Sequence, residues 1–397
     1  MSDVTERIRG AVHAAVGHDS AVAHVTGAAR YLDDVPIVSG TLEAALVLCP
    51  HAHARIRRVD LSAALAAPGV LAAITAADIP GKNDIAPIRS DEPALAADVV
   101  EYDGQPVAAI AATTLDRARA AAKLVATDYE PLVPVLTIEE AMARESYVSP
   151  PQIMVRGEVE GALARAPHRL AGELRCGGQD HFYLEGQIAL ATPGEASDMH
   201  VWSSTQHPTE VQRGVADLLG LPLNAVTVEV RRMGGAFGGK ESQATIIAGI
   251  AAVLAWKARR PVKLRLPRDD DMRATGKRHP FLIRYDVGFD ADGHILALDL
   301  TLAANGGNVA DHTPAVLTRA LCHADNCYFL PNSASAACRA RPTPCRIPRS
   351  GAMAGRRACL RSRRSSRRSR ADSAFPFIWY GGATSTASAA TTSLPTA

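Results

Sequence analysis

A glycine-rich turn constrains this sequence more than any other stretch. It runs from Arg231 to Glu241 and carries four glycines in the order Met-Gly-Gly-Ala-Phe-Gly-Gly-Lys-Glu. Before it, residues 226–230 alternate branched and polar side chains as a β-strand does; after it, residues 242–256 are apolar and alanine-rich over about four helical turns. Glycines in a tight strand-to-helix turn let backbone N–H groups approach a ligand closely. The pattern predicts a cradle for an anion or a cofactor.

Two other interpretations fit parts of this turn. The spacing from Gly234 to Gly239 and Lys240 matches a phosphate-binding P-loop, but such a loop continues with Ser or Thr, whereas this one continues with Glu241. A carboxylate there would repel phosphates, which disfavours nucleoside triphosphates. The glycines alone leave open a turn that only satisfies backbone geometry.

Four further motifs lie at residues 177–185, 204–206, 276–281 and 319–328. Together with the glycine turn they resemble, in order and separation, the molybdenum-cofactor motifs of the xanthine dehydrogenase and aldehyde oxidase family. The resemblance is greatest to the molybdenum-binding large subunit of the bacterial xanthine dehydrogenases. It covers roughly residues 17–332.

The resemblance and the local patterns together predict an α+β chain with a disordered end. The expected parts are a leader at 1–16, a hammerhead-like α/β domain at 17–130, a linker at 131–156, the N-terminal part of a molybdopterin-binding α+β domain at 157–332, and a disordered tail at 333–397. Period-two patterns predict strands at 42–48, 107–112 and 199–204 and a hairpin of 281–289 with 294–303. Helical patterns predict helices at 115–126, 139–143 and 209–219.

Three residues acquire cofactor roles from the resemblance. It implies that Gln206 donates its side-chain amide to a ligand of the molybdenum, and that the backbone of Phe237 and Gly238 lies beside the metal. Gln206 and Phe237 are thus the expected neighbours of the metal. Without the resemblance, Gln206 would be interpreted as a cap of the following helix and Phe237 as a core residue.

Two charged residues indicate the substrate. The resemblance implies that Glu241 hydrogen-bonds the edge of a purine and that the guanidinium of Arg319 stabilises negative charge on the purine ring in the transition state. The expected reaction is hydroxylation of hypoxanthine and xanthine to urate, as part of purine metabolism. Another molybdenum hydroxylase, acting on aldehydes or other N-heterocycles, is the alternative within the same class.

The resemblance also implies a molybdenum–molybdopterin cofactor and further redox groups. Electrons are expected to leave through 2Fe–2S clusters to FAD and NAD⁺. The seven cysteines form no repeated Cys-x-x-Cys pairs, so an iron–sulfur and FAD subunit is expected as a partner in a hetero-oligomer. The sequence has neither a long apolar run nor a secretory signal. We therefore expect a cytoplasmic protein without membrane or nucleic-acid partners.

The segment from Ser333 onward differs from the rest in composition. It holds twelve arginines and one acid, Asp372, although the whole chain has a formal net charge of only +2. Such a basic tail is typical of a nucleic-acid-binding arm, and equally of out-of-frame translation. Read one base out of register, it can be written in codons that give the family's Arg-Gly-Tyr-Gly-Gly turn. Our hypothesis is a frameshift at Pro331–Asn332, which sequencing of the gene tests.

The same hypothesis predicts an inactive polypeptide. The family's general base lies beyond residue 397, and the Arg-Gly-Tyr-Gly-Gly turn is lost with the frame. We expect the chain as given to lack turnover and not to retain its molybdenum cofactor. Metal analysis of the purified protein, combined with a xanthine-to-urate assay, measures both; stoichiometric molybdenum with urate formation would refute the expectation.

Overall fold

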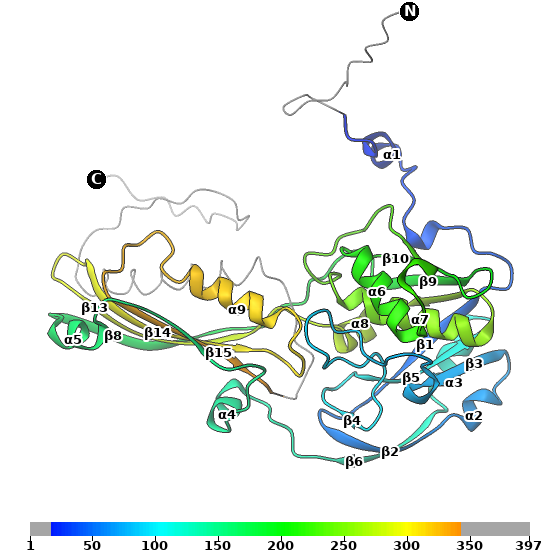
Figure 1. Ribbon diagram of the computed structural model, residues 1–397, viewed down its shortest axis with the longest axis horizontal. Helices are drawn as coiled ribbons and strands as arrows, with labels where there is room; N and C mark the ends of the chain where they lie inside the picture. Colours follow the sequence, from blue (N-terminus) through cyan, green and yellow to red (C-terminus); the bar gives the residue numbers. More distant parts are fainter. Residues whose placement is uncertain (1–16, 343–397) are drawn as a thin grey trace, which may run out of the picture.

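The computed structural model describes residues 17–342, which form two lobes lying side by side (Figure 1). The larger lobe is built on a seven-stranded sheet and the smaller on a five-stranded sheet. The predicted leader at 1–16 and the residues after 342 lie outside the described part. Between residues 17 and 342, none of the helices has the length and apolar character needed to cross a bilayer.

The larger lobe combines strands from both halves of the sequence. In spatial order its sheet consists of β11 (Val226–Glu229), β10 (Met199–Ser203), β9 (Ile188–Pro193), β12 (Val262–Arg265), β1 (Leu42–Leu48), β5 (Pro106–Ala112) and β3 (Val70–Thr75). Its helices are α2 (Ser62–Leu65), α3 (Leu115–Ala122), α6 (Pro208–Leu219), α7 (Gln243–Ala258) and α8 (Arg268–Ala274). Helix α1 (Ala21–Val25) buries no residue and projects away from the lobe (Figure 1). A small sheet of β4 (Val99–Val100), β2 (Ala54–Asp60) and β6 (Ala126–Pro131) completes it.

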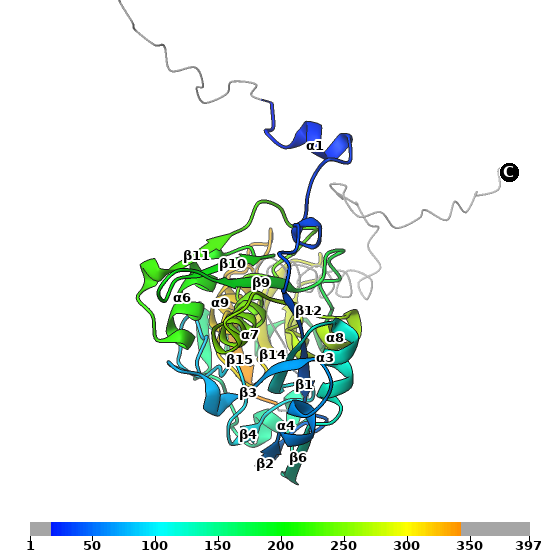
Figure 2. The ribbon, with the colours of Figure 1, turned by 90° about the vertical axis from the view of Figure 1, so that its right-hand side faces the viewer.

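Helix α7 is the centre of this lobe (Figure 2). Every residue from Gln243 to Ala255 is buried, as expected for a helix that is apolar on all sides. It packs against β9, β10 and β12 and against the neighbouring helix α6. The helix therefore fixes the position of the glycine turn, which ends at Glu241, two residues before the first residue of the helix.

The sheet crosses the predicted division between the two domains. Strand β1 pairs in parallel with β12, with Leu42 opposite Val262. One hydrophobic core includes Leu42 and Ile74 from the first half together with Ile247 from the second. The two halves consequently share one core, and the domain limits at 17–130 and 157–332 stay a prediction about sequence segments.

The smaller lobe is a sheet with helices on both faces. Its strands, in spatial order, are β7 (Gln152–Arg156), β15 (Ser333–Ala340), β14 (Ile295–Asn305), β13 (Phe281–Phe289) and β8 (His168–Cys176). Helix α9 (Thr313–Cys322) packs on the face that carries Ile283, whereas α4 (Ile138–Ala143) packs on the face of Leu282. Helix α5 (Val159–Arg165) lies along β14 and β13. Neighbouring residues of β13 face opposite helices because side chains alternate along a strand.

Two predictions of secondary structure are wrong. The segment Ser333–Ala340, which was expected to be disordered, forms β15 between β14 and β7. Its alanines and serines are small enough to be buried while the two neighbouring strands pair with its backbone. The helix predicted at 115–126 ends at Ala122, because Ala126 begins β6 and pairs with β2. The rest of the tail lies outside the described residues.

Candidate functional site

The glycine turn connects β11 to α7 and adopts backbone angles that are rare for side-chain-bearing residues. Positive φ values occur at Gly235 (+92°), Phe237 (+56°) and Gly238 (+90°). A phenylalanine in the left-handed region is strained by about 1–3 kcal/mol, and such residues concentrate at functional sites. Phe237 is also 61% exposed, although Ala236 and Gly238 on either side of it are buried, so the turn displays one aromatic ring at the surface. The sequence interpretation of Phe237 as a core residue is thereby excluded.

The segment beneath the turn explains why two of its glycines are needed. A Cβ atom at Gly234 would lie 2.5 Å from Cβ of Glu185, and one at Gly239 would lie 2.6 Å from Cγ of His181. Both distances are shorter than real Cβ contacts. The glycines therefore let the turn pack directly on residues 181–185 while Phe237 stays exposed, and this arrangement fits a cofactor cradle.

Gln206 lies against the turn and is fixed by it. Its side-chain oxygen Oε1 accepts hydrogen bonds from the backbone N–H groups of Gly238 (3.0 Å) and Lys240 (3.3 Å). Its own N–H donates to the carbonyl of Lys240 at 2.9 Å. Because Oε1 faces the turn, the amide Nε2 points the other way, and it has no partner among residues 17–342. The structure thus brings Gln206, Phe237 and Gly238 together and leaves one amide donor without a partner among the described residues.

A buried ion pair holds both ends of the turn. The Lys240 side chain is fully buried, and its Nζ donates to the carbonyl of Glu185 (2.8 Å) and to Oγ of Ser204 (2.7 Å). The Glu185 carboxylate lies 3.5 Å from Nζ and accepts from the N–H of Gly234 at 2.8 Å. Burial lowers the pKa of Lys240 to about 8 despite the attraction of Glu185. Since Nζ faces inward, Lys240 does not present its charge to a phosphate, which excludes the P-loop alternative.

Glu241 and Arg319 come from different lobes. Glu241 precedes α7, and its Oε2 lies 3.4 Å from Nε2 of His312, the residue before α9. Arg319 lies on α9, seven residues after His312, which places the two on one side of the helix roughly 10 Å apart along its axis. The Arg319 side chain is exposed and forms no ion pair with Glu241 within the described part of the chain. The structure therefore connects Glu241 to α9 without bringing it into contact with Arg319.

Several neighbours of the turn were missed as site residues by the sequence prediction. Lys240 and His181 lie within recognised motifs, and burial beneath the turn distinguishes them. Asp311 and His312 lie between β14 and α9, and they reach Ser242 and Glu241 only because the start of α9 approaches the start of α7. A separation of about seventy residues in the sequence gives no pattern that links them to the turn, so these two required the tertiary structure.

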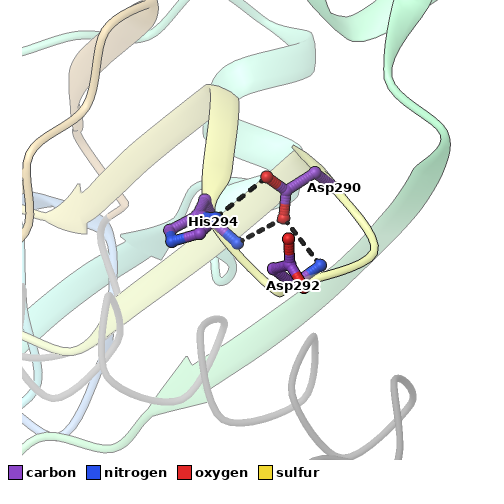
Figure 3. A group of neighbouring side chains, drawn as sticks. All are labelled: Asp290, Asp292 and His294. Atoms are coloured by element: carbon purple, nitrogen blue, oxygen red, sulfur yellow. Dashed lines mark hydrogen bonds and ion pairs between the residues drawn. The ribbon is translucent and has the colours of Figure 1, made fainter.

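One side-chain group in the described residues has the composition of a cation site. The ligand atoms of Asp290, Asp292 and His294 lie within 4.8 Å of one another at the turn of the β13–β14 hairpin (Figure 3). However, Oδ1 of Asp290 accepts from the N–H groups of Asp292 (2.9 Å) and His294 (2.8 Å), and its Oδ2 contacts Nδ1 of His294. These contacts fold the predicted Asp290–Gly293 turn, so the group has a structural explanation.

A cavity of the larger lobe lies away from the glycine turn. It has a volume of about 620 Å³ and is lined by β1, α3 and residues 264–273. None of the turn residues, Gln206 or Arg319 contributes to its wall. The candidate site is therefore defined by the turn and its partners, and not by this cavity.

Two family descriptions match the chain. Residues 26–133 match the "Aldehyde oxidase and xanthine dehydrogenase, a/b hammerhead domain", and residues 145–355 match the "Molybdopterin cofactor-binding domain". The predicted fold class, a hammerhead domain followed by a molybdopterin-binding domain, is confirmed. The second match extends beyond Asn332, and the frameshift hypothesis stays a prediction.

Similar proteins agree with these matches. Xanthine dehydrogenase/oxidase of Gallus gallus is 43% identical over 79% of this chain and 23% of its own length, and xanthine dehydrogenase of Oryza sativa subsp. japonica is 45% identical over 81% and 24%. The chain thus spans about a quarter of the length of these relatives. Among solved structures, aldehyde oxidoreductase from Desulfovibrio gigas superposes with a TM-score of 0.77 at 27% identity, over 83% of this chain and 38% of that one.

Proposed function

Because the chain belongs to the xanthine dehydrogenase and aldehyde oxidase family, we propose that it is the molybdenum-binding part of an enzyme that hydroxylates hypoxanthine and xanthine to urate. The observation that carries this proposal is the side-chain amide of Gln206, which is fixed against the glycine turn and keeps its Nε2 without a partner among the described residues. When bound, the molybdenum–molybdopterin cofactor supplies the oxidation of an electron-poor ring carbon. The residues of this chain supply position and charge.

Gln206 and the turn are suited to hold the cofactor. The two N–H groups that fix Oε1 of Gln206 leave its Nε2 as a donor of fixed direction, and an amide donates without adding charge to the site. Phe237 and Gly238, both at positive φ, continue the turn beside Gln206, with Phe237 exposed and Gly238 buried. A cofactor oxygen or metal ligand beside Nε2 would meet a preorganised hydrogen-bond donor.

Glu241 and Arg319 are proposed to bind the purine. A carboxylate at Glu241 accepts a hydrogen bond from an N–H at the edge of the ring, and a guanidinium at Arg319 stabilises negative charge that develops on it. A connection between their elements supports a shared role, since His312, which precedes the helix that carries Arg319, lies 3.4 Å from Glu241. A purine needs both an acceptor and a cationic donor, whereas an aldehyde substrate needs neither.

The electron path is proposed to continue on another polypeptide. In the described part of the chain the cysteines are free and scattered among separate elements, at Cys49, Cys176, Cys322, Cys327 and Cys338. We propose that an iron–sulfur and FAD partner accepts the electrons and passes them to NAD⁺. The chain alone is accordingly expected to be inactive.

The cofactor role of Gln206 can be tested by equilibrium binding, because retention through purification is not expected. The full chain is titrated with molybdenum cofactor released from another enzyme, and bound molybdenum is measured after rapid filtration. We expect Gln206→Ala to weaken binding at least tenfold, since loss of one orienting donor typically reduces metal-site affinity about 10–100-fold.

A glutamine outside the site provides the matched control. Gln152 lies on the exposed strand β7 of the smaller lobe, and Gln152→Ala should leave the titration unchanged. Equal binding by the wild type and Gln206→Ala would refute the proposed role of the turn as the cofactor site.

A further inference from the structure

The starts of α7 and α9 meet in a cluster of four side chains. Glu241 and Ser242 precede α7, and Asp311 and His312 precede α9. Asp311 is 1% exposed, whereas the side chains of His312 and Glu241 are 28% and 35% exposed. The cluster therefore runs from a buried carboxylate, through an imidazole, to a carboxylate that reaches solvent at the candidate site.

The buried end of the cluster fixes the imidazole. Asp311 is held at a positive φ of +35°, and its Oδ2 accepts a hydrogen bond from Oγ of Ser242 at 3.0 Å. Its Oδ1 lies 2.5 Å from Nδ1 of His312. An ionised carboxylate can only accept, so Nδ1 carries the hydrogen of this contact. Asp311 thereby selects the orientation and the Nδ1–H form of the ring.

The other nitrogen of the ring faces Glu241. Nε2 of His312 lies 3.4 Å from Oε2 of Glu241. With its hydrogen on Nδ1, a neutral ring would turn a lone pair toward the lone pairs of the carboxylate, which is repulsive. The contact is attractive only when a proton lies between Nε2 and Oε2. Glu241 then has Oε2 engaged and keeps Oε1 without a partner among the described residues.

From these contacts we propose that His312 is a positioning residue for Glu241. A proton shared between His312 and Glu241, on a ring oriented by buried Asp311, holds the carboxylate so that Oε1 is presented to the ligand. The role of Oε1 as acceptor for a purine edge rests on the proposed function, whereas the contact itself does not. His312 also connects α9, which carries Arg319, to the glycine turn.

Nuclear magnetic resonance of the full chain, with ¹⁵N-labelled histidine and neither cofactor nor purine, tests the contact. His312→Asn identifies the His312 signals, and asparagine is a good residue at this helix start. We expect Nδ1 of His312 to be protonated and its Nε2 signal to move in Glu241→Gln. An unprotonated Nδ1, or an Nε2 signal that ignores Glu241→Gln, would overturn the proposal.

A second histidine–glutamate pair is the matched control. Nε2 of His200 lies 3.6 Å from Oε2 of Glu229 on the strands β10 and β11. Glu229→Gln should move the His200 signal and leave that of His312 in place, and Glu241→Gln should do the reverse. If Glu241→Gln moves the signals of both His312 and His200, the variant has unfolded generally, and this outcome would also contradict the proposal.

The same contact can be followed through the carboxyl signal of Glu241 instead of the histidine signals. In protein with ¹³C-labelled glutamate, His312→Leu should shift the carboxyl signal of Glu241, and His312→Gln, which keeps a nitrogen donor, should restore part of that shift. Equal shifts in both variants would refute positioning by a hydrogen bond. Because no metal is present, failure of the cofactor titration would refute the proposed function and leave this outcome unaffected.

Discussion

Lys240→Ala should lower the free energy of unfolding by about 3–5 kcal/mol, because it leaves a mostly buried carboxylate without its cation. The side chain of Glu185 is only 10% exposed. Its carboxylate also accepts hydrogen bonds from Oγ of Ser204 and from the backbone N–H of Gly234. With the ammonium removed, the carboxylate must either attract water into the core or release the turn. Urea unfolding followed by circular dichroism measures the loss.

A half-exposed lysine in an ion pair gives the control for Lys240. Lys257 pairs with Asp78, with side-chain exposures of 39% and 28%, and Lys257→Ala should cost about 1 kcal/mol or less. The double variant Lys240→Met with Glu185→Gln removes both charges and should recover part of the loss. If Lys240→Ala lowers the free energy of unfolding no more than Lys257→Ala does, the pair of Lys240 with Glu185 does not hold the turn in place.

Acid should destabilise the protein through His181. This ring lies beneath Gly239, is 7% exposed, and has an Nε2 atom without a partner in residues 17–342. Burial, followed by the charges of Arg278 and Lys277, lowers its pKa from 6.5 to about 4. Between these values the unfolded chain binds the proton and the native chain does not, so stability falls as the pH falls. The full effect is roughly 3 kcal/mol.

The pH effect is measured as a difference between two proteins. The contribution of neutral His181 to the free energy of unfolding is fully present above pH 6.5 and is lost as the pH falls to about 4. The wild type should therefore lose more stability over this interval than His181→Leu. His24→Leu, at an exposed position of α1, should follow the wild type at every pH. Parallel curves for the wild type and His181→Leu would show that the ring is not buried as a neutral group.

Local patterns were sufficient for most individual elements around the site. The strand predicted at 226–230 is β11, and the helix predicted at 242–256 is α7 at Gln243–Ala258. The predicted helix at 209–219 begins at Pro208 and ends where Gly220 takes a left-handed φ of +65°. Alternation, helical periodicity and glycine at a helix end act within a few residues, so the sequence carries these signals directly.

Local sequence patterns predicted the wrong secondary structure where the neighbours of a segment in the fold decide its conformation. The serines and alanines of β15 have no strand pattern of their own, and they are ordered by β14 on one side and β7 on the other. Similarly, residues 123–126 were included in the helix predicted from the pattern of α3, but pairing of Ala126 with Asp60 draws the end of this segment into a sheet. Pairing with distant strands outweighed local propensity in both cases.

By itself, the sequence determined the family, the strand–turn–helix frame and the positions of Gln206, Phe237, Gly238, Glu241 and Arg319 along the chain. Only the tertiary structure decided that Gln206 turns its oxygen to the glycine turn, that Lys240 is buried against Glu185, and that His312 reaches Glu241. The reason is physical: hydrogen bonding and helical periodicity within a segment act over a few residues, whereas burial and contact depend on how segments far apart in the sequence pack together.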